Sequence, residues 1–423
     1  MSTDPFGTAD LRAAVLGTWR ASPARLREDA NTEEDHARGY YRDRVLVDLA
    51  QNASDAAVRA GVPGRLLLRL ELEDAGPLLT VANTGRPLDA AGVAALASMR
   101  ASAKRDETGL VGRFGVGFAA VRAVADEIEV RSATGSVGFS LAGTVAALAD
   151  APPDLAQEVA RRGDWLPVLR LPFVSTAGPL PGYDTAVVAR LRDDEALDRV
   201  RTQLDAVGDP LLLALPGLVE IVVETPDGPP RRVNDVGARW YVQSGRGELD
   251  PALTADRPVE ERDRTAWRVT WALPRPGVDP TWAHVLHAPT PTDDPCSLPA
   301  LLVATLPLDP TRRRVAPGPL TDAVLAQAAQ VYATLAGRLA ADGQDVWSLV
   351  PTGLPAGELD GRLGALLVDA LARTPLLTGR DGLVEPGAAV ALDGPAGHET
   401  ALVDALAARL PGLVHLPPGR AAA

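Results

Sequence analysis

Two stretches of this sequence combine residue types and spacings that suit phosphate chemistry. In the first, Asp48, Asn52 and Asp55 stand at positions i, i+4 and i+7, so a helix over 42–60 places them on one face. A carboxylate at Asp48 can accept a proton from an attacking water, and the amide oxygen of Asn52 can ligate Mg²⁺, which prefers oxygen ligands. The plainer interpretation is a solvated helix face, with Asp48 paired to Arg44.

The second stretch is the glycine loop GLVGRFGVGF over 109–118. Its glycines, Gly112, Gly115 and Gly117, leave few side chains in the way, and an apolar run that favours a helix follows at once. Main-chain N–H groups and a helix N-terminus in such a loop can approach an anion closely. On its own the loop is a weak signal, because many loops need glycine only to turn.

The elements that would position these residues follow from periodicity and turn composition. The helix over 42–60 ends at Gly61-Val62-Pro63-Gly64, and residues 83–87 have a turn composition. Residues 1–40 are polar, with short helical pieces over 10–20 and over 22–35, and are predicted to form an arm or cap. Strands are predicted over 65–72, 78–82, 127–131, 137–141, 168–173 and 185–191, and helices over 89–99, from the glycine loop to about 125, and over 195–207.

A second α/β region is predicted after about residue 205, giving domains over 1–205 and 206–423. Proline-rich turns separate its elements. Strands are predicted over 218–224, 231–242, 266–272 and 301–306, and helices over 320–341, 359–373 and 399–410.

Composition narrows the functional classes. The chain of 423 residues carries a net charge of −13, which argues against nucleic acid or an acidic membrane as its general partner. No apolar run is long enough to span a membrane, and the N-terminus lacks the pattern of a signal peptide. A single cysteine, Cys296, fits a reducing cytosol, so a cytoplasmic location is predicted.

Taken in order, these parts resemble the GHKL superfamily of ATP-binding domains, above all sacsin-type ATPase domains and the ninety-kilodalton heat-shock chaperones. VDLAQNASDAA resembles the family helix with its acid and its Mg²⁺-binding Asn, and GLVGRFGVGFAAVRAVADEIEV resembles the GQFGVGF-type loop. TVANTGRPL stands where the family reads adenine, SAK at 102–104 resembles the lid's S-x-K, and DTAVVARLRDDE over 184–195 resembles the late strand.

The resemblance covers residues 42–191 and implies a Bergerat-type α/β sandwich, with a mixed, mostly antiparallel sheet and helices on one face, followed by a middle-type α/β domain. It implies a Mg²⁺-dependent ATP-binding protein and slow ATPase with a chaperone-like cycle of lid closure. The resemblance allows protein clients or partner proteins, and it allows dimerisation without requiring it. Asp48 would be the catalytic base and Asn52 the metal ligand. ATP would contact Asn52, Asp55, Asn83, Gly85, Ser102, Lys104, Gly112, Arg113, Phe114, Gly115, Val116, Gly117, Phe118 and Thr185.

Two departures from the family put hydrolysis in question. Asp48 replaces the usual Glu, which withdraws the carboxylate by roughly 1.5 Å, and a misplacement of about 1 Å can cost on the order of 10²-fold in rate. Asn83 replaces the adenine-binding Asp and loses charge assistance of about 1 kcal/mol. A nucleotide-binding scaffold or switch with little hydrolysis is therefore the leading alternative.

Two other functional classes are built on related ATP-binding domains. A sensor histidine kinase would need a phospho-accepting His on a long helix ahead of Asn52, and His36 lies in a polar, poorly periodic stretch. A DNA-repair or topoisomerase ATPase is disfavoured by the acidic balance. In the second region, His284, His287 and Cys296 lack a ligand motif, and one of Arg312, Arg313 and Arg314 is a candidate to reach the phosphate, as an arginine of the chaperones does.

Overall fold

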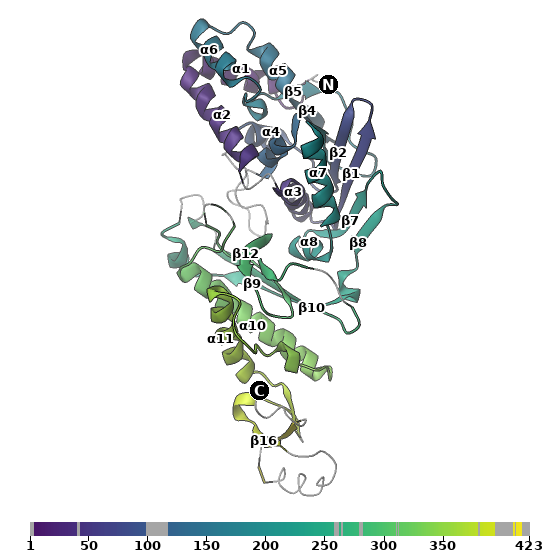
Figure 1. Cartoon of the computed structure of the whole chain (residues 1–423), viewed down its shortest axis with the longest axis vertical. Coiled ribbons are helices and arrows are strands. Elements are labelled where there is room, and N and C mark those ends of the chain that lie inside the picture. The colour runs from purple at the N-terminus through teal and green to yellow at the C-terminus, as the bar shows by residue number, and fades with distance from the viewer. Residues whose placement is uncertain are drawn as a thin grey trace. The chain divides into compact units, whose positions relative to one another are not determined.

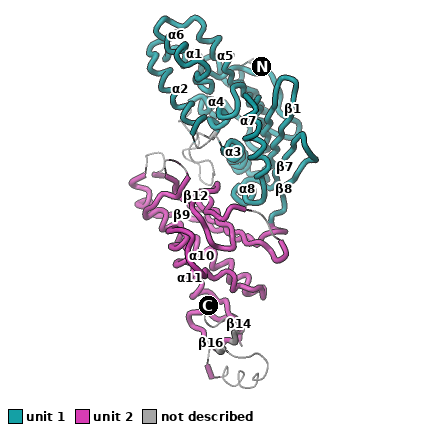
Figure 2. The backbone as a smooth tube through the Cα atoms, viewed as in Figure 1, with its two compact units in different colours: residues 1–236 teal, residues 237–423 magenta. Residues whose placement is uncertain are grey.

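The chain folds into two compact units, Met1–Val236 and Gly237–Ala423, coloured separately in Figure 2. Each combines helices with β-sheet, so the α/β class is confirmed. The first unit extends past the predicted boundary at 205 because β7 (Leu218–Glu224) pairs with β1 (Gly64–Glu73). The computed structural model describes residues 4–39, 43–98, 117–257, 262–263, 265–278, 282–309, 311, 313–379, 381–393, 409–410 and 412–416.

Within the described residues, eight strands of the first unit form one sheet in the order β5-β4-β3-β6-β2-β1-β7-β8. Among these strands, neighbours run antiparallel except β1 and β7, which are parallel. The remaining strands are β2 (Gly76–Asn83), β3 (Ala125–Ser132), β4 (Gly135–Ser140), β5 (Phe173–Ser175), β6 (Thr185–Leu191) and β8 (Arg231–Asn234).

The two faces of this sheet carry different layers. Helices α3 (Val45–Ala60) and α7 (Asp194–Asp205) pack on one face of the sheet (Figure 1). Alternate residues of the central strands, such as Leu66, Leu68 and Val81, lie in the main core with these helices. The residues between them, such as Leu67 and Ala82, form a smaller apolar cluster on the opposite face. Because side chains alternate along a strand, the position of a residue in this pattern tells which face it occupies.

Helix α3 ends at its C-terminus where the sequence predicts. Gly61 adopts a left-handed conformation with φ 65°, and the N–H groups of Gly61 and Val62 donate to the carbonyls of Val58 and Ala57. This is the Schellman arrangement that a C′ glycine favours. At the other end, Gln203 of α7 accepts from the N–H of Leu46 at 3.0 Å, so a distant side chain caps the first turn.

The predicted N-terminal arm is an integral part of the first unit. It forms α1 (Thr8–Ala21) and α2 (Pro23–Arg38), whose Trp19 and Leu26 are fully buried with residues that follow β4, among them Leu155. The other helical segments of this unit are α4 (Ala90–Ser98), α5 (Leu141–Ala147), α6 (Pro153–Arg162), α8 (Asp209–Ala214), and the 3₁₀ turns η2 (Gly117–Ala123) and η3 (Val168–Arg170).

Three predicted elements take another form. The segment after the glycine loop is the 3₁₀ turn η2, since β3 already begins at Ala125. The strand predicted over 168–173 is split into η3 and β5, because the N–H groups of Val168 and Leu169 donate to a side-chain carboxylate instead of a neighbouring strand. The strand predicted over 231–242 is interrupted at Asp235, which has a φ of 45°.

The second unit packs one sheet, in the order β12-β11-β13-β10-β9, against α10 and α11, with Trp271 and Tyr332 at the centre of its core. A smaller sheet follows in the order β15-β14-β17-β16. The bounds are β9 (Trp240–Glu248), η5 (Pro251–Thr254), β10 (Ala266–Pro274), β11 (Val285–His287), β12 (Pro291–Pro295), β13 (Leu301–Ala304), α10 (Pro319–Ala341), η6 (Trp347–Leu349), α11 (Glu358–Ala372), β14 (Leu377–Gly379), β15 (Gly382–Val384), η7 (Pro386–Ala388), β16 (Val390–Asp393) and β17 (Leu413–Leu416). The helix predicted over 399–410 falls outside the described residues up to 408, and Arg409 and Leu410 are not helical.

Among the helices of the described residues, none has the length and apolar character needed to cross a membrane.

Candidate functional site

The turn after β2 is fastened to helix α3. Gly85 has a φ of 138°, and a Cβ added there would lie 2.6 Å from the carbonyl carbon of Ala56. The next N–H, that of Arg86, donates to the carbonyl of Ala56 at 2.9 Å. Only glycine fits this conformation and this approach, so the glycine in the turn holds the end of β2 against the second half of α3.

Asp184, just before β6, closes the same turn from the other side. Its carboxylate accepts from the N–H of Gly85 at 2.8 Å, and its own N–H donates to the carbonyl of Asn83 at 3.0 Å. These two bonds place the start of β6 beside the end of β2. Thr185 is then the direct register partner of Asn83.

A polar row crosses the sheet at this end. Asn83, Thr185 and Ser132 are successive register partners on β2, β6 and β3, and the hydroxyls of Thr185 and Ser132 lie 3.3 Å apart. Each stands in phase with the strand residues of the main core, so all three occupy the face that packs against α3. Ser132 also accepts from the N–H of Leu88 at 3.0 Å, which fixes the chain leaving the turn.

Helix α3 packs on the same face of this sheet and carries the predicted chemistry. Asp48 and Asn52 are half-buried, whereas Asp55 is fully buried. The side-chain Nδ2 of Asn83 donates to the carbonyl of Thr84 at 3.2 Å, which leaves the acceptor oxygen of that amide outside this bond. Asp55, Asn83, Gly85 and Thr185 are therefore grouped at one end of the sheet and along the helix that covers it.

The end of the glycine loop enters the same core. Gly117 and Phe118 begin η2, which packs against α3. Phe118 is buried, with its ring 5.8 Å from that of Phe139. The other predicted ATP contacts from the lid and the loop, Ser102, Lys104, Gly112, Arg113, Phe114, Gly115 and Val116, lie outside the described residues.

Asp48 and Asn52 on α3 are oxygen donors, the type of ligand that Mg²⁺ prefers. In the described ranges, no cluster of three or more His, Cys, Asp or Glu side chains could hold a metal ion by itself. Mg²⁺ is usually held by one or two protein oxygens together with phosphate oxygens and waters. An acid and an amide on one helix could supply such protein oxygens.

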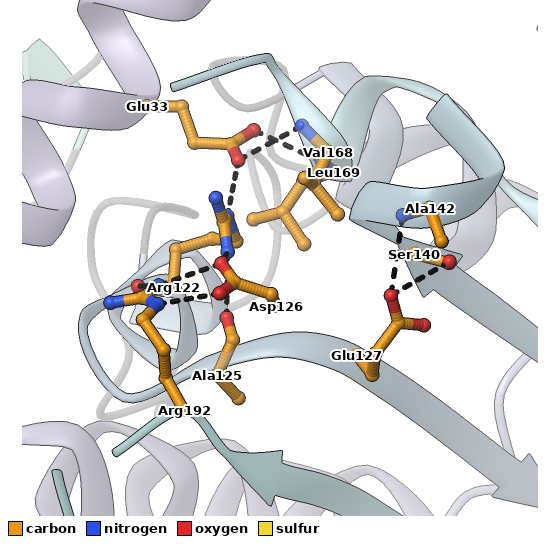
Figure 3. Close-up of polar contacts among 10 residues, drawn as sticks. All are labelled: Glu33, Arg122, Ala125, Asp126, Glu127, Ser140, Ala142, Val168, Leu169 and Arg192. Atoms are coloured by element: carbon orange, nitrogen blue, oxygen red, sulfur yellow. Dashed lines mark hydrogen bonds and ion pairs between the residues drawn. The ribbon is translucent and has the colours of Figure 1, made fainter. Parts of the chain in front are cut away.

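An ion-pair network lies at the far end of η2 (Figure 3). Asp126 at the start of β3 accepts from both Nε and an Nη of Arg192, at 2.6 and 2.8 Å, and it also pairs with the buried Arg122. Burial alone would raise the pKa of the Asp126 carboxyl, but hydrogen bonds from Arg192 and the charge of Arg122 outweigh burial, and the pKa lies below its ordinary value of 3.8.

This lowered pKa gives a pH dependence of known sign. The unfolded chain binds the proton more readily, so the contribution of Asp126 to the free energy of unfolding is present at neutral pH and is lost as pH falls below about 4. Urea unfolding at several pH values should show Asp126→Asn less stable than the wild type at pH 7, with a smaller difference at about pH 3. A difference that stays constant across this range would contradict the assignment.

Sequence reasoning missed three residues of this site region. Ser132 ends a strand with nothing in its local pattern to distinguish it, and its neighbours are set by sheet register. Asp184 precedes the matched Thr185, and its bond to Gly85 joins residues that lie 99 positions apart in the chain. Arg122 looked like a polar residue on a predicted helix, yet it is almost fully buried.

The candidates in the second unit have structural partners. The ring of His284 lies 4.5 Å from that of Trp282, and His287 is buried at the end of β11. Cys296 is buried, and burial raises the pKa of its thiol to about 11. Of the arginine run, Arg313 pairs with Asp293 at 2.8 Å, Arg314 is exposed, and Arg312 lies outside the described residues.

The chain matches no protein-family model, and a search of curated proteins finds no significant match. Any assignment of function therefore depends on the chain's own residues.

Proposed function

We propose that the first unit binds ATP with Mg²⁺ in a Bergerat-type α/β sandwich of the GHKL superfamily, and hydrolyses it slowly. The observation that carries the proposal is the polar row of Asn83, Thr185 and Ser132, on the sheet face against which α3 packs. That helix brings Asp48 and Asn52 to the same layer. An adenine edge and a phosphate chain need this combination of neutral hydrogen-bonding groups and oxygen ligands.

In this proposal the described residues divide into two groups. Asn83 and Thr185 offer an amide and a hydroxyl to the base, with Gly85 keeping the turn tight against α3. Gly117 and the N–H of Phe118 stand at the start of η2, where main-chain donors can meet phosphate oxygens.

Asn52 would ligate magnesium, and Asp48 would act on water. When bound, Mg²⁺ neutralises charge on the phosphate oxygens. The carboxylate of Asp48 would take the proton of a water that attacks the terminal phosphorus as the bond to the leaving ADP breaks. The Asp in place of Glu favours slow turnover, and it also supports the alternative of a nucleotide-binding switch without turnover.

Asn52→Ala tests the binding half of the proposal. Loss of the amide oxygen should weaken Mg²⁺-ATP binding by about 10- to 100-fold, as loss of one hydrogen bond to a charged group does. Because alanine favours helix and Asn52 is half-buried, the free energy of unfolding should change by about 1 kcal/mol or less. Isothermal titration with ATP at several Mg²⁺ concentrations measures the effect.

Gln51→Ala is the matched control, since Gln51 is its half-buried neighbour on α3. If both substitutions left the affinity unchanged, or lowered it equally, Asn52 would not be the metal ligand.

A further inference from the structure

A buried ion pair connects helix α2 to the turn η2. The side chains of Glu33 and Arg122 are 3% and 2% exposed, and Nε of Arg122 donates to Oε1 of Glu33 at 2.6 Å. The same guanidinium donates to the carbonyl of Ala125 at 2.7 Å and also pairs with Asp126. Figure 3 shows Arg122 between the carboxylates of Glu33 and Asp126. Arg122 thus joins α2, η2 and the start of β3.

Glu33 has a second set of bonds. Its two oxygens accept from the N–H groups of Val168 and Leu169, each at 3.0 Å (Figure 3). These bonds satisfy backbone donors of η3 that no neighbouring strand reaches. One carboxylate on α2 therefore fixes η3 and, through Arg122, the turn η2.

The position of η2 matters because of what flanks it. It packs against both α2 and α3. Apolar contacts join Phe118 to the core of Leu46 and Leu49 on α3, but apolar contacts resist sliding less than charged hydrogen bonds of fixed direction do. The ion pair with α2 therefore adds bonds of fixed direction to the apolar contacts that hold η2.

Stability alone is a poor explanation for this pair. Desolvating two charges costs several kcal/mol per ion, and well-packed apolar residues often replace a buried ion pair without loss. The fork of Arg122 instead satisfies three acceptors at defined angles, a geometry that lysine cannot reproduce. Such a pair contributes most where the place of a backbone segment has to be defined.

We infer that Glu33 and Arg122 are positioning residues of the nucleotide site, which hold the backbone of Gly117 and Phe118 where phosphate oxygens can meet it. The inference rests on the proposed function, and it adds to that site two residues, Glu33 and Arg122, that the sequence resemblance did not assign to it. Neither residue touches the nucleotide; both act through η2.

The test compares Glu33→Gln and Arg122→Lys with Glu158→Gln. Glu33→Gln keeps the shape and one acceptor, and Arg122→Lys keeps the charge but removes the planar fork. The control Glu158 is also a buried, ion-paired carboxylate, at 5% exposure, but it joins α6 to α2 through Arg27. Mg²⁺-ATP titration and hydrogen exchange over 117–123 are measured below the unfolding temperature, with urea unfolding to compare stabilities.

We expect both positioning variants to bind Mg²⁺-ATP about tenfold more weakly, with faster exchange over 117–123, as loss of an outer-shell partner does at other sites. Glu158→Gln should lose comparable stability and keep wild-type affinity. Wild-type affinity in a folded Glu33→Gln or Arg122→Lys would overturn the inference, as would an equal loss in Glu158→Gln. If the wild type itself bound no nucleotide, the proposed function would fail, while the exchange data would still report whether the pair holds η2.

Discussion

Asp48→Asn is expected to lower Mg²⁺-dependent phosphate release by about 100-fold or more, the contribution of a general base to a proton transfer. Asparagine keeps the size of the side chain but cannot accept the proton of the attacking water. Position 48 lies one turn before Asn52 on α3, so the substitution leaves Asn52, the proposed metal ligand, unchanged. The affinity for Mg²⁺-ATP should therefore stay within about threefold of the wild type. Phosphate release under single-turnover conditions, together with an equilibrium titration, measures both quantities.

The matched control is Asp43→Asn, the same chemical change at an exposed position just before α3. It should leave both rate and affinity unaltered. A rate that falls in neither variant would remove Asp48 as the base. Absence of turnover in the wild type, with intact binding, would favour the nucleotide-binding switch over the ATPase.

Gly85→Ala is expected to destabilise the first unit by about 3 kcal/mol or more, which combines backbone strain with overpacking against α3. The residue has a φ of 138°, and its added Cβ would meet the Ala56 carbonyl carbon at 2.6 Å. The turn can relieve that contact only by moving away from α3. Asn83, at the end of β2 beside this turn, would move with it. Nucleotide binding should therefore be lost in whatever fraction remains folded. Urea unfolding followed by hydrogen exchange of the first unit measures the change.

Gly76→Ala separates the two causes. Gly76 has a φ of 110° at the start of β2, directly after the β1–β2 turn, but nothing lies within 4 Å of an added Cβ. It should cost only the strain, about 1 kcal/mol. Equal losses in the two variants would show that the approach of Gly85 to α3 has no energetic consequence.

The local parts of this fold were predictable from the sequence. The apolar side of α3 and its glycine stop predict the helix end that is observed, and the strands predicted over 65–72 and 78–82 lie within β1 and β2. These features depend on residues within one or two turns of each other, where periodicity and turn chemistry are decisive.

The parts that sequence reasoning missed depend on contacts between distant residues. Gln203 caps α3, Asp184 binds the turn at Gly85, and Glu33 satisfies the backbone of η3. No local pattern distinguishes these polar residues from solvated ones. The burial of the N-terminal segment was missed for the same reason, since α2 is polar by composition but buries Glu33 and Leu26 against segments more than a hundred residues away.

The prediction of a regular helix after the glycine loop was wrong for a different reason. The apolar run there reads as helix, but β3 begins at Ala125, and the side chain of Arg122 bonds to the carbonyl of that residue. These tertiary contacts restrict the segment to a 3₁₀ turn, which changes how the end of the glycine loop packs in the core.

Nucleotide binding is tested directly by titration of the intact chain with ATP, ADP and a non-hydrolysable ATP analogue, each with and without Mg²⁺. We expect saturable one-site binding that strengthens with Mg²⁺, with added hydrogen-exchange protection at Asn83–Arg86, Thr185 and the start of η2. If none of the three nucleotides bound at about millimolar concentration, a free energy of only about −4 kcal/mol, the proposed nucleotide site would be contradicted.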